Sequence, residues 1–202
     1  MKSLSEIDTT AKRASKAVGF SWGIAEEIGK NIRLLELFGI PGIKNLNQYY
    51  KIYKDRQFQN ISLISKNNIS KIPYCPIMLG VNFLDQIYIM EEMDNVEFKN
   101  VAFPILLLPF LSRTSEIISK KIQLKIDKID FLLNFNKSIF CSHKIIDIIE
   151  NAEKLTLKFI ENKNSFTENE WNELYKLSED TFVDENDDQK LKAAGAGLTD
   201  ND

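Results

Sequence analysis

The spacing of apolar residues changes once along this chain, from a helical period to a strand period, and this change limits the possible folds more than any other feature. Apolar residues recur every three or four positions from Leu4 to Val18, which is typical of an amphipathic helix that ends at Gly19. The stretch SWGIAEEIGKNIRLLELFGIPG predicts a second helix from about Gly23 to Phe38, with Ser21 as its N-cap. The stretch IKNLNQYYKIYK predicts a third helix.

Farther along the chain, apolar and polar residues alternate as they do in half-buried strands. This alternation occurs at residues 61–65, 121–127, 128–135 and 154–161. Asp127 and Lys128 are placed to form a tight turn between two of these strands. Helices followed mainly by strands predict an α+β fold, in which a helical N-terminal third packs on a mostly antiparallel or mixed sheet.

Three other segments of the sequence also carry structural signals, some of which fit more than one structure. The segment after Pro76 is compatible with a helix, whereas PILLLPFLSRTSEIISK fits either a strand or a helix, because a short apolar run does not separate the two. Thr167 and Glu170 stand in the register of a capping box, which predicts a short C-terminal helix. A tail rich in Gly and Asp follows this helix.

The composition supports one folded domain over residues 1–202, since 44% of the residues are hydrophobic and 27% are charged. The chain holds only two cysteines, and its first residues lack the apolar core of a signal peptide, so we expect a cytoplasmic protein. The apolar run NVAFPILLLPFLS contains two prolines and is shorter than the about 20 residues of a membrane helix, so no membrane partner is expected.

The net charge of −3 is distributed unevenly. Residues 179–202 hold eight acidic residues and two lysines, so the preceding part of the chain is basic. No basic stripe interleaved with aromatic residues is present, and an acidic tail repels phosphate, which argues against nucleic acid as a partner. The basic part of the chain would attract the acidic tail, so the tail is a candidate to fold back onto it.

In the second predicted helix, Glu27 projects onto the apolar stripe between Leu34 and Phe38, with Asn31 beside it. A carboxylate on an apolar face requires a partner, a hydrogen bond or a metal. Glu27 is therefore the candidate catalytic acid or base, or it lies at the edge of the stripe and reaches water or caps a neighbouring element. Glu26 projects toward the polar side, where an i,i+4 pair with Lys30 is expected.

Other candidate ligand-binding residues surround the start of this helix. Ser21 and Trp22 lie where unpaired N–H groups favour an anion, and Asn31 is polar on the apolar face. Arg113 would suit a carboxylate or phosphate ligand by bidentate pairing, or it serves as the partner of Glu27 or of an acidic tail residue. We expect Gly29, inside the helix, to permit a close approach, most simply of another backbone.

The tail AGAGLTDND combines small residues with oxygen ligands. If it returns to a cleft, Gly195, Gly197, Thr199 and Asn201 could contact a polar substrate. Asp200 and Asp202 could bind a divalent cation such as Mg²⁺. Composition alone favours a solvated tail without these contacts.

The head GFSWGIAEE, at 19–27, and the tail AGAGLTDND, at 194–202, resemble the two signature stretches of an uncharacterised bacterial family of proteins of about this length, catalogued as a domain of unknown function. The middle of the chain is similar to that family only in its CP and PILLLP segments, and its lysine-rich parts depart from it. The resemblance implies that the tail is a feature of the family, but it implies no activity, cofactor or catalytic residue.

Two hypotheses of function follow. In the first, the protein is a small metabolic enzyme or ligand-binding protein with a site between the Ser21–Glu27 helix start and the tail, and a small polar metabolite is its partner. Glu27 would then be the acid or base, Trp22 a wall and Arg113 an anion clamp. In the second, a non-catalytic subunit docks its apolar helical face and its tail on a partner protein. A homo-oligomer is compatible with both.

Overall fold

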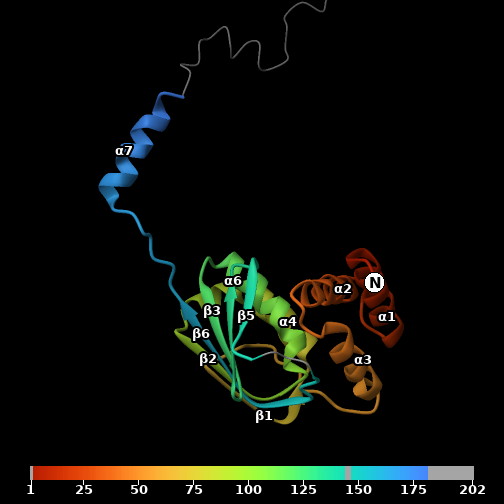
Figure 1. Ribbon diagram of the computed structural model, residues 1–202. Coiled ribbons are helices and arrows are strands. Elements are labelled where there is room, and N and C mark those ends of the chain that lie inside the picture. Colours follow the sequence, from red (N-terminus) through yellow and green to blue (C-terminus); the bar gives the residue numbers. More distant parts are fainter. Residues whose placement is uncertain (1, 144–146, 182–202) are drawn as a thin grey trace, which may run out of the picture. The chain divides into compact units, whose positions relative to one another are not determined.

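The computed structural model describes residues 2–143 and 147–181, and the chain divides into two compact units, Met1–Asn162 and Lys163–Asp202 (Figure 1). The helices are α1 Leu4–Val18, α2 Trp22–Leu37, α3 Gly42–Tyr53, α4 Pro76–Asp85, α5 Ile87–Glu91, the 3₁₀ turn η1 Pro104–Leu107, α6 Leu108–Ile117 and α7 Glu168–Glu179. The strands are β1 Asn67–Tyr74, β2 Asn95–Ala102, β3 Lys121–Ile126, β4 Ile129–Asn134, β5 Ser138–Cys141 and β6 Asn151–Ile160.

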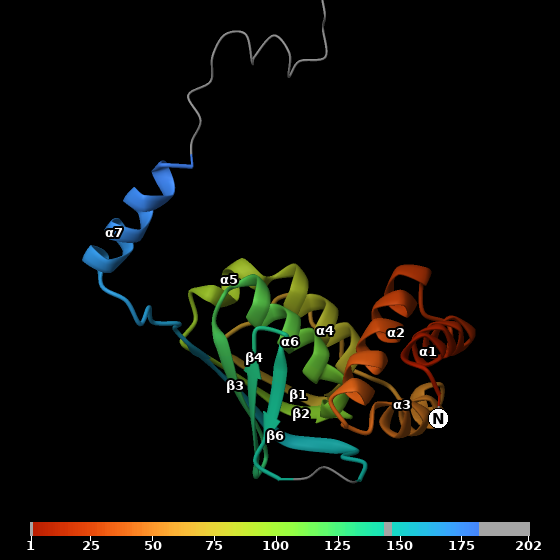
Figure 2. The same cartoon turned by 45° about the horizontal axis from the view of Figure 1, so that its top comes forward.

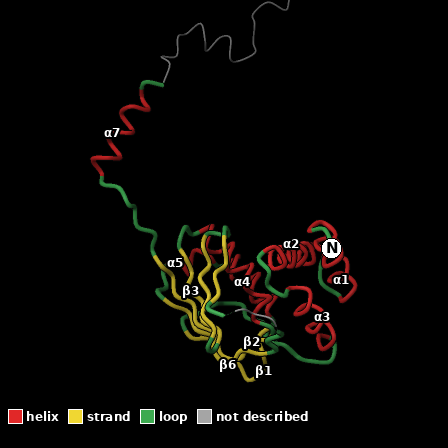
Figure 3. The backbone as a smooth tube through the Cα atoms, in the orientation of Figure 1, coloured by secondary structure: helices red, strands yellow, loops and turns green. Residues whose placement is uncertain are grey.

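The six strands form one mixed sheet in the order β1-β2-β6-β3-β4-β5 (Figure 3). Strands β1 and β2 are parallel, and every other neighbouring pair is antiparallel. Because helices precede most of the strands and the connections between the later strands are short, the predicted α+β class is confirmed, with a mixed sheet.

The sheet has one apolar face and one polar face because its residues alternate. On the apolar face, Leu124 of β3 lies opposite Leu157 of β6, and both side chains are fully buried. The next residues, Lys125 and Lys158, are exposed. Helices α4 and α6 lie over one face of the sheet, and α1 to α3 lie at one side of this layer (Figure 2). The core therefore lies between the apolar face and the helices.

Helices α1 and α2 pack closely because Gly29 has no side chain. A Cβ atom at this position would lie 2.7 Å from Asp8 Oδ1 and 2.8 Å from the Asp8 carbonyl oxygen. The expected close backbone approach at Gly29 is thus confirmed. The predicted caps are confirmed as well, since the Ser21 hydroxyl accepts a hydrogen bond from the Ile24 N–H and Gly19 ends α1.

Several sequence expectations need correction. The predicted strand at 61–65 is wrong: the segment is a loop in which the Ile64 N–H donates to the Gln86 side-chain oxygen at 2.8 Å, and the strand begins only at Asn67. Strands β2 and β5 were not predicted. The ambiguous PILLLP segment forms η1 and the start of α6, whereas the turn at Asp127 is confirmed by its positive φ of 51°.

The second unit contains α7. Thr167 and Glu170 form the predicted capping box, so the helix begins where the sequence placed it. None of its residues is buried. Within the described parts of the chain, no helix has both the length and the apolar character needed to span a membrane.

Candidate functional site

Glu27 and Arg113, which lie far apart in the sequence, form an ion pair between α2 and α6. Lys30, one turn along α2, donates to the other carboxylate oxygen of Glu27 at 3.0 Å. Burial by itself raises the pKa of Glu27, but the hydrogen bonds and charges of Lys30 and Arg113 outweigh it and hold this pKa below its ordinary value. The Glu27 carboxylate is therefore ionised at neutral pH.

This pair shows why a carboxylate occupies the apolar stripe of α2. Of the readings open for Arg113, the structure shows the one in which it is the partner of Glu27. The expected pair of Glu26 with Lys30 is wrong, because Glu26 binds Lys12 of α1 and Lys30 binds Glu27. The catalytic role of Glu27 stays a prediction.

Several donors near this pair are buried without a protein acceptor among the described residues. They are Arg113 Nε and Nη2, which together form the outer edge of the guanidinium group, and Asn31 Nδ2. The Asn31 side chain is 3% exposed, as a polar residue on the apolar face of α2 should be. The interior between α2 and α6 thus favours negative charge, which Glu27 supplies.

A second arrangement lies at the start of α2. We call it the Ser21 pocket, a hollow of about 480 Å³ lined by Gly19, Phe20, Ser21, Ile24, Tyr53, Lys54, Arg56, Phe58, Asn60, Cys75 and Met78. Its polar part consists of Lys54, Arg56, Asn60 and the beginning of the helix. Its apolar part includes Tyr53 and Phe58, whose rings stack at 5.9 Å.

Cys75 lines this pocket and is 2% exposed. Its Sγ atom lies 3.1 Å from the Tyr49 hydroxyl and accepts from the Met78 N–H, so that it caps α4. Burial raises the pKa of the thiol, which keeps it neutral and weakly nucleophilic. The contact of Cys75 with Tyr49 carried no signal in the sequence.

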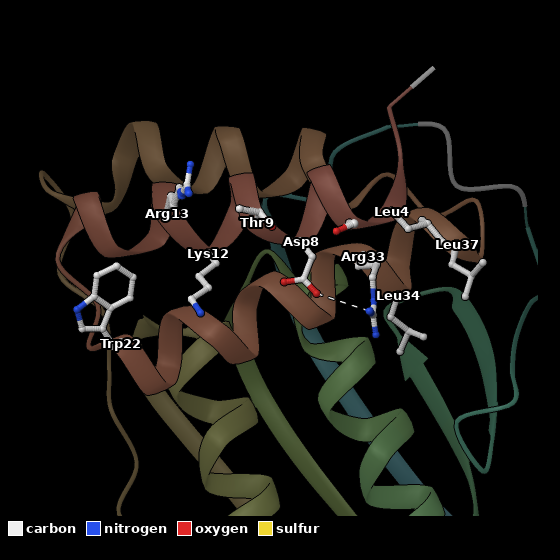
Figure 4. Close-up of a pocket in the computed structure, with 10 residues that line it drawn as sticks. Leu4, Asp8, Thr9, Lys12, Arg13, Trp22, Arg33, Leu34 and Leu37 are labelled. Carbon is white, nitrogen blue, oxygen red and sulfur yellow. Dashed lines mark ion pairs between the residues drawn. The ribbon is translucent and has the colours of Figure 1, made fainter.

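Trp22, the neighbour of Ser21, lines a different hollow. We call this hollow the α1–α2 groove; its volume is about 690 Å³ and it is lined by Leu4, Ser5, Asp8, Thr9, Lys12, Arg13, Trp22, Arg33, Leu34 and Leu37 (Figure 4). The structure therefore separates Ser21 from Trp22, which the sequence analysis placed in one site. Adjacent residues of a helix project about 100° apart, so they face different surfaces.

The predicted tail contacts cannot be placed. Gly195, Gly197, Thr199, Asp200, Asn201 and Asp202 all lie outside the described residues. In the described ranges, no group of three or more His, Cys, Asp or Glu side chains is arranged to hold a metal ion. The proposed divalent cation therefore stays a prediction that concerns the tail.

Comparisons with known proteins bear on the N-terminal part of the chain. Neither the curated proteins nor the solved structures include a significant match. One family model matches residues 2–75, a segment that contains α1 to α3 and β1, all of the α1–α2 groove and all of the Ser21 pocket except Met78. It includes the head GFSWGIAEE but not the tail. Residues 2–75 match the family model described as Protein of unknown function (DUF3726), which confirms the resemblance to an uncharacterised family for this part of the chain.

Proposed function

We propose that this protein binds a small anionic metabolite with an apolar body in the Ser21 pocket. The observation that carries the proposal is that two cations, Lys54 and Arg56, line the pocket and have no ion-pair partner in the described part of the chain. Lys54 is the C-cap of α3 and Arg56 follows it, and both line the same pocket as Ser21, the N-cap of α2. Cations and a helix N-terminus on one hollow both favour a negative group.

The N-terminus of α2 contributes donors as well as charge. The first N–H groups of a helix have no acceptor within the helix, and the Ser21 side chain satisfies only that of Ile24. The N–H groups of Trp22 and Gly23 can therefore donate to a carboxylate or a phosphate. A fork of donors from Arg56 would add bidentate pairing, which is stronger than a neutral hydrogen bond.

The remaining lining selects the body of the ligand. Ile24, Phe58 and Met78 are partly buried apolar residues that pack on the core, and Tyr53 stacks on Phe58. These side chains gain from contact with carbon atoms rather than with water. A monocarboxylate or a phosphate ester with a hydrocarbon or aromatic portion fits this combination. Because the Cys75 thiol is neutral, the proposal is one of binding and not of covalent catalysis.

The test is a thermal-shift screen of the full chain against monocarboxylates and phosphate esters. We expect ligands of this class to raise the melting temperature, because a ligand that binds only the folded state stabilises it. Arg56→Glu should weaken binding at least about tenfold, since a charge-assisted hydrogen bond contributes roughly 1.5–3 kcal/mol.

Lys51→Glu is the matched control. Lys51 is exposed on α3, and its replacement by Glu changes the charge by the same amount as Arg56→Glu but outside the pocket. It should leave binding within about twofold of the wild type, as expected for an exposed charge. If no anion shifts the melting temperature, or if Arg56→Glu and Lys51→Glu weaken binding equally, the pocket is not the site.

A partner-binding function is the second candidate, and α7 favours it. Trp171, Leu174 and Tyr175 are 49%, 64% and 52% exposed and recur at the spacing of one helix face. The same helix carries Glu168, Glu170, Glu173 and Glu179 against Lys176. An acidic amphipathic helix of this kind suits an apolar groove bordered by Lys or Arg on another protein.

For this candidate, we expect a Trp171→Ser, Leu174→Ser double variant to lose a partner that the wild-type chain retains on co-purification from its source cells. Its melting temperature should not change by more than about 1 °C, because neither side chain is buried. Asn172→Ser, on the same helix and outside the apolar and acidic residues named above, is the control. Retention of the same proteins by the wild type and by the double variant would contradict the assignment.

A further inference from the structure

A further hollow lies among the first three helices. We call it the α1–α3 slot; its volume is about 190 Å³ and it is lined by Lys2, Glu6, Ile7, Thr10, Ala11, Ala14, Ile32, Ile43, Leu46 and Asn47. It shares no lining residue with the Ser21 pocket or with the α1–α2 groove. The slot exists because α1 and α3 each pack more closely on α2 than on each other.

Small side chains on α1 keep the slot open. Ala11 and Ala14 border it from α1, Leu46 from α3 and Ile32 from α2. Ile32 and Leu46 are almost fully buried, so the deep part of the slot is apolar. Because an alanine side chain ends at Cβ, the space that a longer side chain of α1 would occupy is left to a ligand. Apolar surface of this kind gains from contact with carbon atoms.

The two ends of the slot differ. At one end, the hydroxyl groups of Ser15 and Tyr50 are hydrogen-bonded between α1 and α3, each one turn beyond a residue that lines the slot. At the other end lie Lys2 and Glu6, whose charged atoms are 3.3 Å apart and whose side chains are 78% and 54% exposed. The slot is therefore closed by a bond between helices at one end and bordered by two opposite charges at the other.

The ion pair at the open end suits a zwitterion. Glu6 accepts from the Ser3 N–H through Oε2, in the capping box of α1, whereas among the described residues its Oε1 contacts Lys2 alone. An exposed pair of this kind contributes little to stability, so its members can exchange partners at low cost. A carboxylate can then pair with Lys2, and an ammonium group can pair with Glu6.

We propose that the α1–α3 slot binds a free aliphatic amino acid of the size of leucine, with its side chain between α1 and α3 and its two charged groups on Lys2 and Glu6. An apolar cavity of about 150 Å³ holds one benzene molecule, so a slot of about 190 Å³ accepts a branched alkyl group. The ligand is neutral overall, as is the pair of charges that it meets. This site goes beyond the anion binding proposed for the Ser21 pocket and does not depend on it.

Isothermal titration calorimetry of the full chain with L-leucine tests the proposal. Each buried methylene group is worth about fourfold in affinity, so L-alanine, which lacks the isopropyl group of leucine, should bind at least about tenfold more weakly. 4-Methylpentanoate and 3-methylbutylamine keep the leucine side chain, but each lacks one charged group. Each should bind about two- to fivefold more weakly than L-leucine, which is the contribution of one exposed ion pair.

A variant that fills the slot locates the site. Ala14→Leu places an isobutyl group in the space of the ligand and should weaken L-leucine binding at least about tenfold. Ala17→Leu is the matched control, because it makes the same change at an exposed position of α1 outside the slot, and it should leave binding within about twofold of the wild type. Asn47→Leu fills the slot from an exposed position of α3 and should act as Ala14→Leu does. Circular dichroism checks that all three variants are folded.

Lys2→Gln tests the charged end of the slot. This variant loses the cation but keeps the apolar walls. It should bind L-leucine about two- to fivefold more weakly than the wild type does. It should bind 3-methylbutylamine, which has no carboxylate, at least as tightly as the wild type does.

Three results would overturn the proposal. The first is a wild type for which L-leucine gives neither heat of binding nor a rise in melting temperature. The second is equal binding by Ala14→Leu and Ala17→Leu, which would place the site elsewhere. The third is 4-methylpentanoate that binds as tightly as L-leucine, which would make the ligand a carboxylate and not an amino acid. Arg56→Glu should leave L-leucine binding unchanged, so a failure here is distinct from a failure of the Ser21 pocket.

Discussion

Replacement of Gly80 by Ala is expected to lower the free energy of unfolding by about 2–3 kcal/mol, which is a large effect for the addition of one methyl group. Gly80 lies in α4, where that helix crosses α6. A Cβ atom there would overlap ring carbons of Phe110 and lie 2.7 Å from Cε2. The Phe110 side chain is fully buried and has no free space to move into, so the helices must separate. Urea unfolding followed by circular dichroism measures the loss.

Gly23 supplies the matched control, because it also lies in a helix but a Cβ atom added there meets nothing within 4 Å. Gly23→Ala should stabilise the protein by up to about 1 kcal/mol through helix propensity and the unfolded state. Adding Phe110→Leu to Gly80→Ala should recover part of the loss by making room. Equal effects of Gly80→Ala and Gly23→Ala would show that α4 and α6 are not packed this closely.

Replacement of Arg113 by Met is expected to cost about 1–2 kcal/mol at neutral pH. Glu27 would keep Lys30 as its partner but lose the cation that faces it from α6. The side chains of Glu27 and Arg113 are 27% and 24% exposed, so the cost should lie between that of a surface pair and that of a fully buried one. Arg33→Met is the control, since the Arg33 side chain is 51% exposed and its pair with Asp8 is long. A loss at Arg33 equal to that at Arg113 would contradict the assignment.

The same pair predicts a pH dependence. The folded-state pKa of Glu27 lies below its ordinary value of 4.5, so its ionised form is favoured in the folded protein. Its contribution to stability is therefore fully present above about pH 4.5 and is lost as the pH falls through the folded-state pKa. Glu27→Gln lacks this contribution. The difference in unfolding free energy between wild type and Glu27→Gln should be largest at pH 6–7 and should shrink below pH 4.5.

Glu27→Gln also addresses the predicted catalytic role. If Glu27 acts on a ligand, the variant should lose binding or activity to a greater extent than its modest loss of stability accounts for. If the ligands found by the thermal-shift screen bind the variant as they bind the wild type, Glu27, which does not line the Ser21 pocket, takes no part in binding them.

The sequence by itself determined the features that depend on neighbouring residues. The caps at Ser21, Gly19 and Thr167 and the turn at Asp127 were predicted correctly because each is made within a few residues of the chain. The need of Glu27 for a partner was also predictable, because the period of a helix places it among apolar residues.

Only the tertiary structure decided which distant groups meet. Arg113 was one of several possible partners for Glu27, and it became the partner because α6 packs against α2. Strand β2 was missed because its alternation of polar and apolar residues is interrupted at Asn100, which has a positive φ of 67° and is followed by the two consecutive apolar residues Val101 and Ala102. Ser21 and Trp22 are adjacent in the sequence, yet they line different hollows. The direction of a side chain is local, but the surface that it faces is created by segments packed from elsewhere in the chain.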